Sequence, residues 1–266
     1  MTALPLPSGT PTYVAPAHWR AVDFISDLHL AADTPAAFEA WARHLSRTQA
    51  DAVFILGDLF EMWVGDDVRP GSFEARCLAV MAEAATRKTI AFMPGNRDFL
   101  VGNAALAASG VERLADPTVV VAFGQRLLVS HGDALCLGDA SYQRFRSIVR
   151  RPWLQSAFAA LPRRAREAIG RRLRAGDGGA SRPRPLIDLD NEATRGWMES
   201  AKTAVLVHGH THAAATLAVG PGQVRHVMTD WHLDGAGPPR AQVLRWRADG
   251  MERIAPDTAP SRPAAP

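Results

Sequence analysis

The first half of the chain alternates short apolar runs, rich in β-branched and aromatic residues, with longer segments whose apolar residues recur at helical spacing. Such alternation is typical of parallel strands joined by crossover helices, because a parallel sheet is buried on both faces. The pattern predicts strands at Ala21–Ser26, Ala52–Leu56 and Thr89–Met93, and helices at Pro35–Arg47 and Ser72–Thr86.

The second half adds antiparallel pairing and a helical insertion. After a short helix that follows Gly102, the chain Phe123-Gly124-Gln125 separates two apolar runs and predicts a hairpin. Residues 140–174 have helical composition but contain Pro152 and Pro162, so we expect three short helices there. The hairpin strands are predicted at Thr118–Ala122 and Arg126–Ser130, and a Gly/Pro-rich loop at Gly176–Pro185. A further helix is predicted at Asn191–Ser200, and four later strands at Thr203–Val207, Ala214–Val219, Val224–Thr229 and Ala241–Arg247.

With 266 residues, 47% of them hydrophobic and 21% charged, the chain suits one large globular domain. We expect this domain over residues 19–250, with a helical cap at about 140–184. A flexible extension is expected at 1–18, and a disordered tail rich in Pro and Ala at 251–266.

Two features of the sequence predict a cytoplasmic location. The first sixteen residues contain no Lys or Arg and are broken by prolines, unlike a secretory signal. Cys77 and Cys136 lie far apart, which fits a reducing compartment. No apolar run approaches the ~20 residues that a membrane-spanning helix needs.

Positive charge is concentrated in one part of the chain. The segment from Arg144 to Arg184 holds twelve arginines and only two acidic residues, which gives it a charge of +10 within a protein whose net charge is +3. We expect an anionic surface or ligand to meet this segment, because arginine binds phosphate through a forked pair of donors. The alternative is that most of these arginines are simply the solvated faces of helices.

Residues of the kinds that bind metals follow five of the predicted strands. The carboxyl ends of strands are where α/β proteins build their sites, because the strand fixes the backbone and the next loop presents side chains to a crevice. The residues are Asp27 and His29 in Ser26-Asp-Leu-His-Leu30, Asp58 in Gly57-Asp-Leu59, Asn96 in Gly95-Asn-Arg-Asp98, His131 in His-Gly-Asp133, and His210 and His212 in Gly209-His-Thr-His212.

Each of these motifs is weak by itself, since Asp and Asn often cap a following helix. Together they supply oxygen and imidazole donors without a thiolate, a set suited to Mn²⁺, Fe²⁺, Co²⁺ or Zn²⁺. Seven ligands are too many for one open catalytic ion and about right for two that share a carboxylate. Two such ions, ~3.5–4 Å apart, serve displacement at phosphorus, with a bridging hydroxide as the nucleophile. The expected chemistry is therefore hydrolysis of a phosphate ester or anhydride.

The order of the five blocks, Asp-x-His, Gly-Asp, Gly-Asn-x-Asp, His-Gly-Asp and Gly-His-x-His, resembles that of the calcineurin-like metallophosphoesterases. The blocks span about 70% of the chain. The resemblance implies an α/β fold, a four-layer α/β/β/α sandwich with a helical cap insertion, and two divalent ions, for which we expect Mn²⁺. It also implies that Asp27, His29, Asp58 and His212 bind one ion, that Asp58, Asn96, His131 and His210 bind the other, and that Asp58 bridges them.

A narrower resemblance, to the UDP-2,3-diacylglucosamine pyrophosphohydrolases of lipid A biosynthesis, lies around these blocks. It is carried by Gly57-Asp-Leu-Phe-Glu-Met-Trp-Val-Gly-Asp-Asp67, Gly95-Asn-Arg-Asp-Phe99 and His131-Gly-Asp-Ala-Leu-Cys136, followed by Asp139, Tyr142-Gln143, Phe145-Arg146 and Arg151-Pro-Trp153. Many calcineurin-like relatives have His after the Asn, whereas this chain has Arg97. A fixed cation there stabilises charge on a pyrophosphate and suits a leaving group that needs no proton.

This narrower resemblance implies a metal-dependent diphosphatase. Water would attack the α-phosphorus of the UDP moiety and release UMP and 2,3-diacylglucosamine 1-phosphate. It implies catalytic roles for Asp58, Asn96, Arg97 and His131, and substrate contacts from Asn96, Arg97, Asp139 and His210, with Arg182 as the counterpart of a lysine in the family. Because the substrate carries two acyl chains, we expect the apolar and basic cap to approach the cytoplasmic face of the inner membrane as a peripheral element.

Two rival interpretations stay open on the sequence alone. A phosphodiesterase or nucleotide pyrophosphatase with a soluble substrate would use the same metals but would have no need of an apolar cap. A nucleic-acid-binding protein would explain the arginines and the aromatic residues Phe145, Trp153 and Phe158. It would leave the predicted metal ligands unexplained, so no nucleic-acid partner is expected, and the sequence predicts no protein partner.

Overall fold

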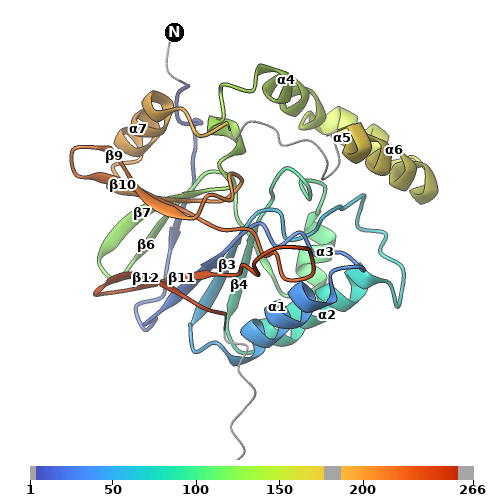
Figure 1. The fold of residues 1–266 in the computed structure, drawn as a ribbon, viewed down its shortest axis with the longest axis horizontal. Coiled ribbons are helices and arrows are strands. Elements are labelled where there is room, and N and C mark those ends of the chain that lie inside the picture. Colours follow the sequence, from blue (N-terminus) through green and yellow to red (C-terminus); the bar gives the residue numbers. More distant parts are fainter. Residues whose placement is uncertain (1–3, 177–186, 257–266) are drawn as a thin grey trace, which may run out of the picture.

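The computed structural model describes residues 4–176 and 187–256. Two six-stranded sheets lie face to face, with helices on both outer sides (Figure 1). The first sheet has the order β12-β11-β2-β3-β4-β5, in which β2 to β5 run parallel and β11 and β12 form an antiparallel hairpin at the edge. Its strands are β2 (Val22–Ile25), β3 (Ala52–Leu56), β4 (Thr89–Met93), β5 (Glu112–Arg113), β11 (Val243–Arg247) and β12 (Gly250–Ile254).

The second sheet is mixed, with the order β1-β6-β7-β8-β10-β9. Strand β7 pairs antiparallel with β6 and parallel with β8, and β10 pairs parallel with β8 and antiparallel with β9. Its strands are β1 (Thr12–Val14), β6 (Thr118–Ala122), β7 (Gln125–Ser130), β8 (Val205–His208), β9 (Ala215–Gly220) and β10 (Gln223–Val227).

Helices complete a four-layer α/β/β/α sandwich. Strand β3 illustrates the layering, because Val53 and Ile55 pack in the cluster shared with α1 and α2, while Phe54 and Leu56 pack against the second sheet. Helices α1 (Pro35–Arg47), α2 (Phe73–Ala85) and α3 (Asn103–Ala108) cover the first sheet, and α7 (Asn191–Ser200) covers the second. The expected fold class is confirmed.

Three further helices form the cap: α4 (Ala140–Val149), α5 (Pro152–Ala159) and α6 (Arg163–Gly176). They follow one another along one side of the body, at the upper right of Figure 1. A short 3-10 helix at Asp133–Leu135 precedes them. Within the described residues, no helix has both the length and the apolar content that a membrane crossing requires.

The structure differs from the sequence prediction at both ends of the domain. Residues 12–14, expected in a flexible extension, form β1, whose Tyr13 ring packs on Phe54 with ring centroids 5.2 Å apart. Residues 251–254, expected in a disordered tail, belong to β12, which pairs with β11 along its whole length. The predicted hairpin turn is also shorter, since Phe123 and Gly124 alone turn the chain, both with positive φ. Of the predicted loop at 176–185, residues 177–185 lie outside the described residues.

A buried charged network joins α1 to the edge hairpin. The carboxylate of Asp23 in β2 accepts hydrogen bonds from Nε and Nη2 of Arg245, at 2.6 and 2.8 Å, and from the hydroxyl of Thr48 at 2.5 Å. Nε2 of His44 lies 3.2 Å from the same carboxylate. Burial raises the pKa of Asp23, but the hydrogen bonds and charge of these partners outweigh burial and lower the pKa to about 2.

Removing this carboxylate should destabilise the fold. In Asp23→Ala, Arg245 and His44 lose their buried anion, so we expect the free energy of unfolding at pH 7 to fall by about 3–5 kcal/mol. Urea unfolding measures this change. Asp249→Ala, an exposed position in the turn before β12, is the control and should change the free energy by less than about 0.5 kcal/mol. Equal stability of the two variants would contradict the prediction.

The same network predicts an acid dependence. The pKa of Asp23 falls from ~3.9 in the unfolded chain to about 2 in the fold. Its stabilisation is therefore fully present above the unfolded pKa and is lost as the pH falls through the folded value. The difference in free energy of unfolding between wild type and Asp23→Ala should therefore become smaller as the pH falls from about 4 to about 2.

Candidate metal centre and its cap

The seven predicted ligands lie in loops at the carboxyl ends of strands from both sheets. The two sheets meet at these loops, since the backbone N–H of His210 donates to the Asp27 carboxylate at 3.0 Å. From the first sheet come Asp27 and His29 after β2, Asp58 after β3 and Asn96 after β4; from the second come His131 after β7, and His210 and His212 after β8.

Five of these seven residues have a left-handed backbone. Non-glycine residues adopt positive φ only at an energetic cost, and such strain concentrates at functional sites. The five residues are Asp27 (55°), His29 (49°), Asp58 (53°), His210 (67°) and His212 (58°). The surrounding structure therefore holds these side chains in positions that the local chain would not choose.

Glycines make room for the candidate ligands. A Cβ on Gly95 would lie 2.1 Å from Oδ1 of Asp58, and a Cβ on Gly209 would lie 2.4 Å from Oδ2 of Asp27. No real Cβ approaches an oxygen so closely. The glycines that precede Asn96 and His210 in the sequence are thus required by the close packing of carboxylates from other loops.

One group of donors consists of Asp27, His29 and His212. The Nε2 atoms of His29 and His212 lie 3.4 Å apart, and Nε2 of His212 lies 3.3 Å from Oδ1 of Asp27. Two nitrogens bound at ~2.1 Å to one tetrahedral ion would lie ~3.4 Å apart. These three residues therefore fit a divalent ion in both donor type and spacing.

A second group surrounds Asn96. Its side-chain oxygen lies 2.8 Å from Nε2 of His131 and 2.9 Å from Nδ1 of His210, and Nε2 of His131 lies 3.7 Å from Oδ1 of Asp58. Nδ1 of His131 faces the carbonyl of Leu56 at 3.0 Å. With a proton on Nδ1, Nε2 is the ring nitrogen that would bind a metal ion.

The distances do not single out a bridging residue. Asp27 belongs both to the group with His29 and His212 and to a second group with Asp58 and His131, whereas Asp58 belongs only to the second. The bridging role of Asp58 stays a prediction.

Electrostatics also suit a cation. Burial raises the pKa of Asp27, but the hydrogen bond and charge of His212 and the neighbouring imidazoles hold it well below its ordinary range. Burial lowers the pKa of His131, but the charges of Asp58, Asp27 and other carboxylates raise it to about 9. His210 is different, because burial and the charge of His131 lower its pKa to about 4 and keep it neutral, as a metal ligand must be.

Asp98 holds the two central loops together. Burial and the charge of Asp58 raise its pKa to about 7. Its carboxylate accepts from the backbone N–H groups of Asp58, Leu59, Phe60 and Gly95, at 3.3, 2.8, 3.2 and 2.8 Å.

The predicted substrate contacts fall in different places. The backbone N–H of Arg97 donates to Oδ1 of Asp58 at 2.8 Å, and its side chain lines a cavity beside Asn96. Asp139 caps α4 by accepting from the backbone N–H of Tyr142 at 2.9 Å. Arg182 lies outside the described residues.

The cavity beside Asn96 and Arg97 has a volume of about 260 Å³ and continues under the cap. Its walls come from the loop after β3, from the loop after β4 and from all three cap helices. Its apolar lining consists of Met62, Trp63, Val64, Phe99, Leu100, Phe145, Val149, Leu154, Phe158, Ile169 and Leu173. The apolar cavity therefore reaches the candidate metal centre at Asn96.

Buried Asp133 anchors the first cap helix. One oxygen of its carboxylate accepts from the hydroxyl of Tyr142 at 2.6 Å, from Nε of Arg146 at 2.8 Å and from Nη2 of Arg150 at 3.2 Å. Burial raises the pKa of Asp133, but Arg150 and Arg146 hold it far below its ordinary range. Because Asp133 lies two residues after His131, the cap is tied directly to a ligand loop.

The third cap helix is anchored to the loop that follows Asp58. Buried Arg166 donates to the carbonyl of Val64 and to the carboxylate of Asp67, and Nη1 of Arg163 donates to the carbonyl of Asp67 at 2.9 Å. Val64 and Asp67 of the Gly57 to Asp67 motif therefore serve to hold the cap on the body. Half of the ten described cap arginines hold the cap to the body or to itself, which the sequence did not reveal.

The sequence also gave no role to Glu61. Its Oε2 lies 3.0 Å from Nδ1 of His29, and its Oε1 accepts from Nη1 of Arg174 at 2.6 Å. Burial raises the pKa of Glu61, but His29 and Arg174 outweigh this effect and lower it. The only signal in the sequence that could have indicated a role for Glu61 is its position three residues after Asp58.

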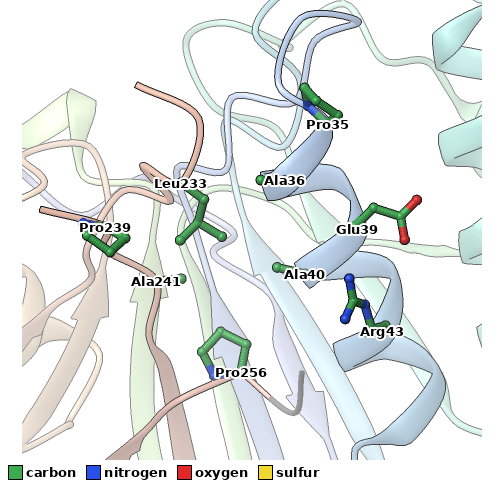
Figure 2. Close-up of a pocket in the computed structure, with 9 residues that line it drawn as sticks. All are labelled: Pro35, Ala36, Glu39, Ala40, Arg43, Leu233, Pro239, Ala241 and Pro256. Carbon is green, nitrogen blue, oxygen red and sulfur yellow. The ribbon is translucent and has the colours of Figure 1, made fainter. Parts of the chain in front are cut away.

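A separate hollow of about 670 Å³ lies beside α1. Figure 2 shows Ala36 and Ala40 of α1 on one side and Leu233, Ala241 and Pro256 on the other. None of the described residues that line it is a predicted site residue.

The similarity to known proteins agrees with this geometry. A match to the calcineurin-like phosphoesterase family covers residues 21–214. A UDP-2,3-diacylglucosamine hydrolase of Ralstonia nicotianae is 42% identical over 254 residues, which cover 90% of this chain and 93% of the relative. A protein of the same name from Escherichia coli O7:K1 is 39% identical over 87% of this chain and 97% of its own. One from Chromobacterium violaceum is 43% identical over 80% of this chain and 91% of its own. The chain therefore belongs to the calcineurin-like phosphoesterases and, within them, to the family of the UDP-2,3-diacylglucosamine hydrolases.

Proposed function

We propose that this protein hydrolyses the pyrophosphate bond of UDP-2,3-diacylglucosamine, with water attacking the α-phosphorus and UMP and 2,3-diacylglucosamine 1-phosphate as products. The observation that carries the proposal is the apolar cavity that opens at Asn96 and Arg97. A ligand bound there would have polar groups beside the candidate metal centre and apolar groups under the cap. The names of the relatives support the same substrate.

The metal centre would hold two divalent ions, which we propose to be Mn²⁺. Asp27, His29, Asp58 and His212 would hold one, and Asp58, Asn96, His131 and His210 the other. When bound, such ions activate water and stabilise charge at phosphorus. The seven side chains would fix the positions of the ions.

Arg97 would bind the pyrophosphate. Its backbone is fixed by the hydrogen bond to Asp58, and Arg97 is one of the residues that line the cavity in which the substrate would lie. A guanidinium stays charged and donates two parallel hydrogen bonds to phosphate oxygens. It would stabilise the developing negative charge on a leaving phosphate, which needs no proton. Asn96, His210, Asp139 and Arg182 are proposed as further substrate contacts.

The acyl chains would enter the cap cavity. Its walls carry aromatic and branched side chains from three helices, whose burial against a hydrocarbon chain contributes roughly 25 cal/mol per Å². A soluble sugar nucleotide would leave these walls exposed to water. The cavity therefore favours a lipid substrate over the soluble substrates of other two-metal phosphodiesterases and nucleotide pyrophosphatases.

We also propose that the outer face of the cap rests peripherally on the cytoplasmic face of the inner membrane. Large apolar side chains are exposed there, among them Trp153 at 63% and Ile148 at 48%. Exposed arginines lie on the three cap helices or just before one of them, and their charge would attract anionic lipid headgroups. They are Arg144, Arg151, Arg164, Arg171 and Arg172.

The substrate proposal predicts selective turnover. With Mn²⁺ present, the protein should release UMP from UDP-2,3-diacylglucosamine in detergent micelles, and more slowly or not at all from UDP-N-acetylglucosamine. Asp58→Ala should be inactive, because it removes a carboxylate from the centre of the proposed metal site. Chromatography of the released UMP measures both effects.

Bis-p-nitrophenyl phosphate serves as a generic ester in the same assay. Turnover of this ester, or of the soluble nucleotide sugar, without turnover of the diacylated substrate would contradict the lipid role and favour a two-metal phosphodiesterase with a soluble substrate. Full activity of Asp58→Ala would contradict its place in the metal centre.

The membrane proposal predicts weaker lipid binding when the exposed face loses apolar area. The double variant Ile148→Ser/Trp153→Ser should float with vesicles of anionic phospholipid about tenfold less strongly than wild type. Val14→Ser, which removes a side chain 70% exposed on β1, is the matched control and should bind as wild type does. Equal flotation of all three proteins would rule out the cap as the contact surface.

A further inference from the structure

The loops that carry His29 and Asp58 run side by side. The backbone N–H of His29 donates to the carbonyl of Asp58 at 3.0 Å, and the N–H of Leu30 donates to that of Leu59 at 2.8 Å. The N–H of Glu61 donates to the carbonyl of Leu30 at 3.0 Å. This backbone pairing places the side chain of Glu61 beside the imidazole of His29.

Glu61 uses its two oxygens for two different partners. Oε2 lies 3.0 Å from Nδ1 of His29, and Oε1 accepts from Nη1 of Arg174 in the last turn of α6 at 2.6 Å. The side chains of His29, Glu61 and Arg174 are 21%, 35% and 23% exposed, so water screens the contacts only in part. Glu61 thus touches the proposed metal centre and the far end of the cap at the same time.

A carboxylate at Nδ1 has a defined effect on the other ring nitrogen. It holds the proton on Nδ1 and orients the ring, which leaves Nε2 as the nitrogen that can bind a metal ion. Nε2 of His29 is the atom that lies 3.4 Å from Nε2 of His212. The position of Glu61 therefore bears directly on how well His29 can bind an ion.

We propose that Glu61 is a positioning residue that couples the cap to the metal centre. Docking of α6 through Arg174 fixes the Glu61 carboxylate, and the carboxylate fixes His29 for the ion shared with Asp27 and His212. The cap then contributes to metal affinity although none of its residues is a proposed ligand. This inference rests on the proposed metal centre and adds a residue to it.

The chain offers a matched control for ordinary cap docking. Arg163 lies on the same helix and contacts the same loop, but through Asp67 and not through Glu61. A purely structural role for the cap arginines would make Arg163→Met and Arg174→Met equivalent. The proposed coupling makes only Arg174→Met affect the metal.

The test is Mn²⁺ binding to the full-length, metal-free protein, followed by the electron paramagnetic resonance signal of free Mn²⁺. Wild type should bind two ions. Glu61→Gln should weaken one of them about tenfold, and Arg174→Met should weaken the same one by a smaller factor. Arg163→Met should bind as wild type does, and Glu61→Gln/Arg174→Met should be no weaker than Glu61→Gln alone.

Wild-type binding in Glu61→Gln would overturn the positioning role. Equal effects of Arg174→Met and Arg163→Met would overturn the coupling to the cap. If Glu61→Gln does not fold, the comparison of the two cap variants still decides the coupling. Failure of wild type to bind two ions would contradict the proposed metal centre itself. This result is distinguishable from failure of the positioning role, in which wild type and Glu61→Gln bind two ions equally well.

Discussion

The close approach of buried carboxylates and imidazoles from two different sheets is the constraint on which the rest of this structure depends. Asp27 and Asp58 come from one sheet, and His131 and His210 from the other, yet their polar atoms converge within contact distance. Such convergence is possible only because Gly95 and Gly209 leave space for the carboxylates. The four backbone hydrogen bonds to Asp98 then hold the loops against the repulsion and strain that the arrangement creates.

The cap extends this arrangement from a metal site to a site for a particular substrate class. Asp133 ties α4 to the loop of His131, while Glu61 and Asp67 tie α6 to the loop of Asp58. The cap is therefore held by charges that lie next to the candidate ligands. The apolar cavity beneath it opens beside Arg97. A pyrophosphate and a hydrocarbon chain on one ligand would find both environments within one opening.

Much of this could be predicted from the sequence, because local patterns fix helices and the ends of buried strands. The helix at Pro35–Arg47 begins with a proline in its first turn and was predicted at its observed bounds. Polar residues after each buried strand identified the seven candidate ligands that the structure brings together. Their binding of metal and substrate stays a prediction.

What the sequence could not reveal depends on pairs of residues far apart in the chain. Glu61 and Arg174 are separated by 113 positions, and no spacing rule connects them. Strand β12 was missed because its adjacent charged residues, Glu252 and Arg253, break the apolar alternation typical of a strand. Only its pairing with β11 reveals it as an edge strand. Several arginines of the basic segment, which the sequence suggested would face an anionic ligand or solvent, instead form hydrogen bonds that hold the cap to the body.

The central claim is that the metal centre and the cap cavity form one site, and a filled cavity tests it most directly. Val149→Trp adds bulk to a residue that lines the cavity, and Ile148→Trp makes the same change at its exposed neighbour. We expect kcat/KM for the diacylated substrate to fall about tenfold in Val149→Trp only, with hydrolysis of bis-p-nitrophenyl phosphate unchanged in both. Wild-type turnover of the diacylated substrate by Val149→Trp would contradict the claim.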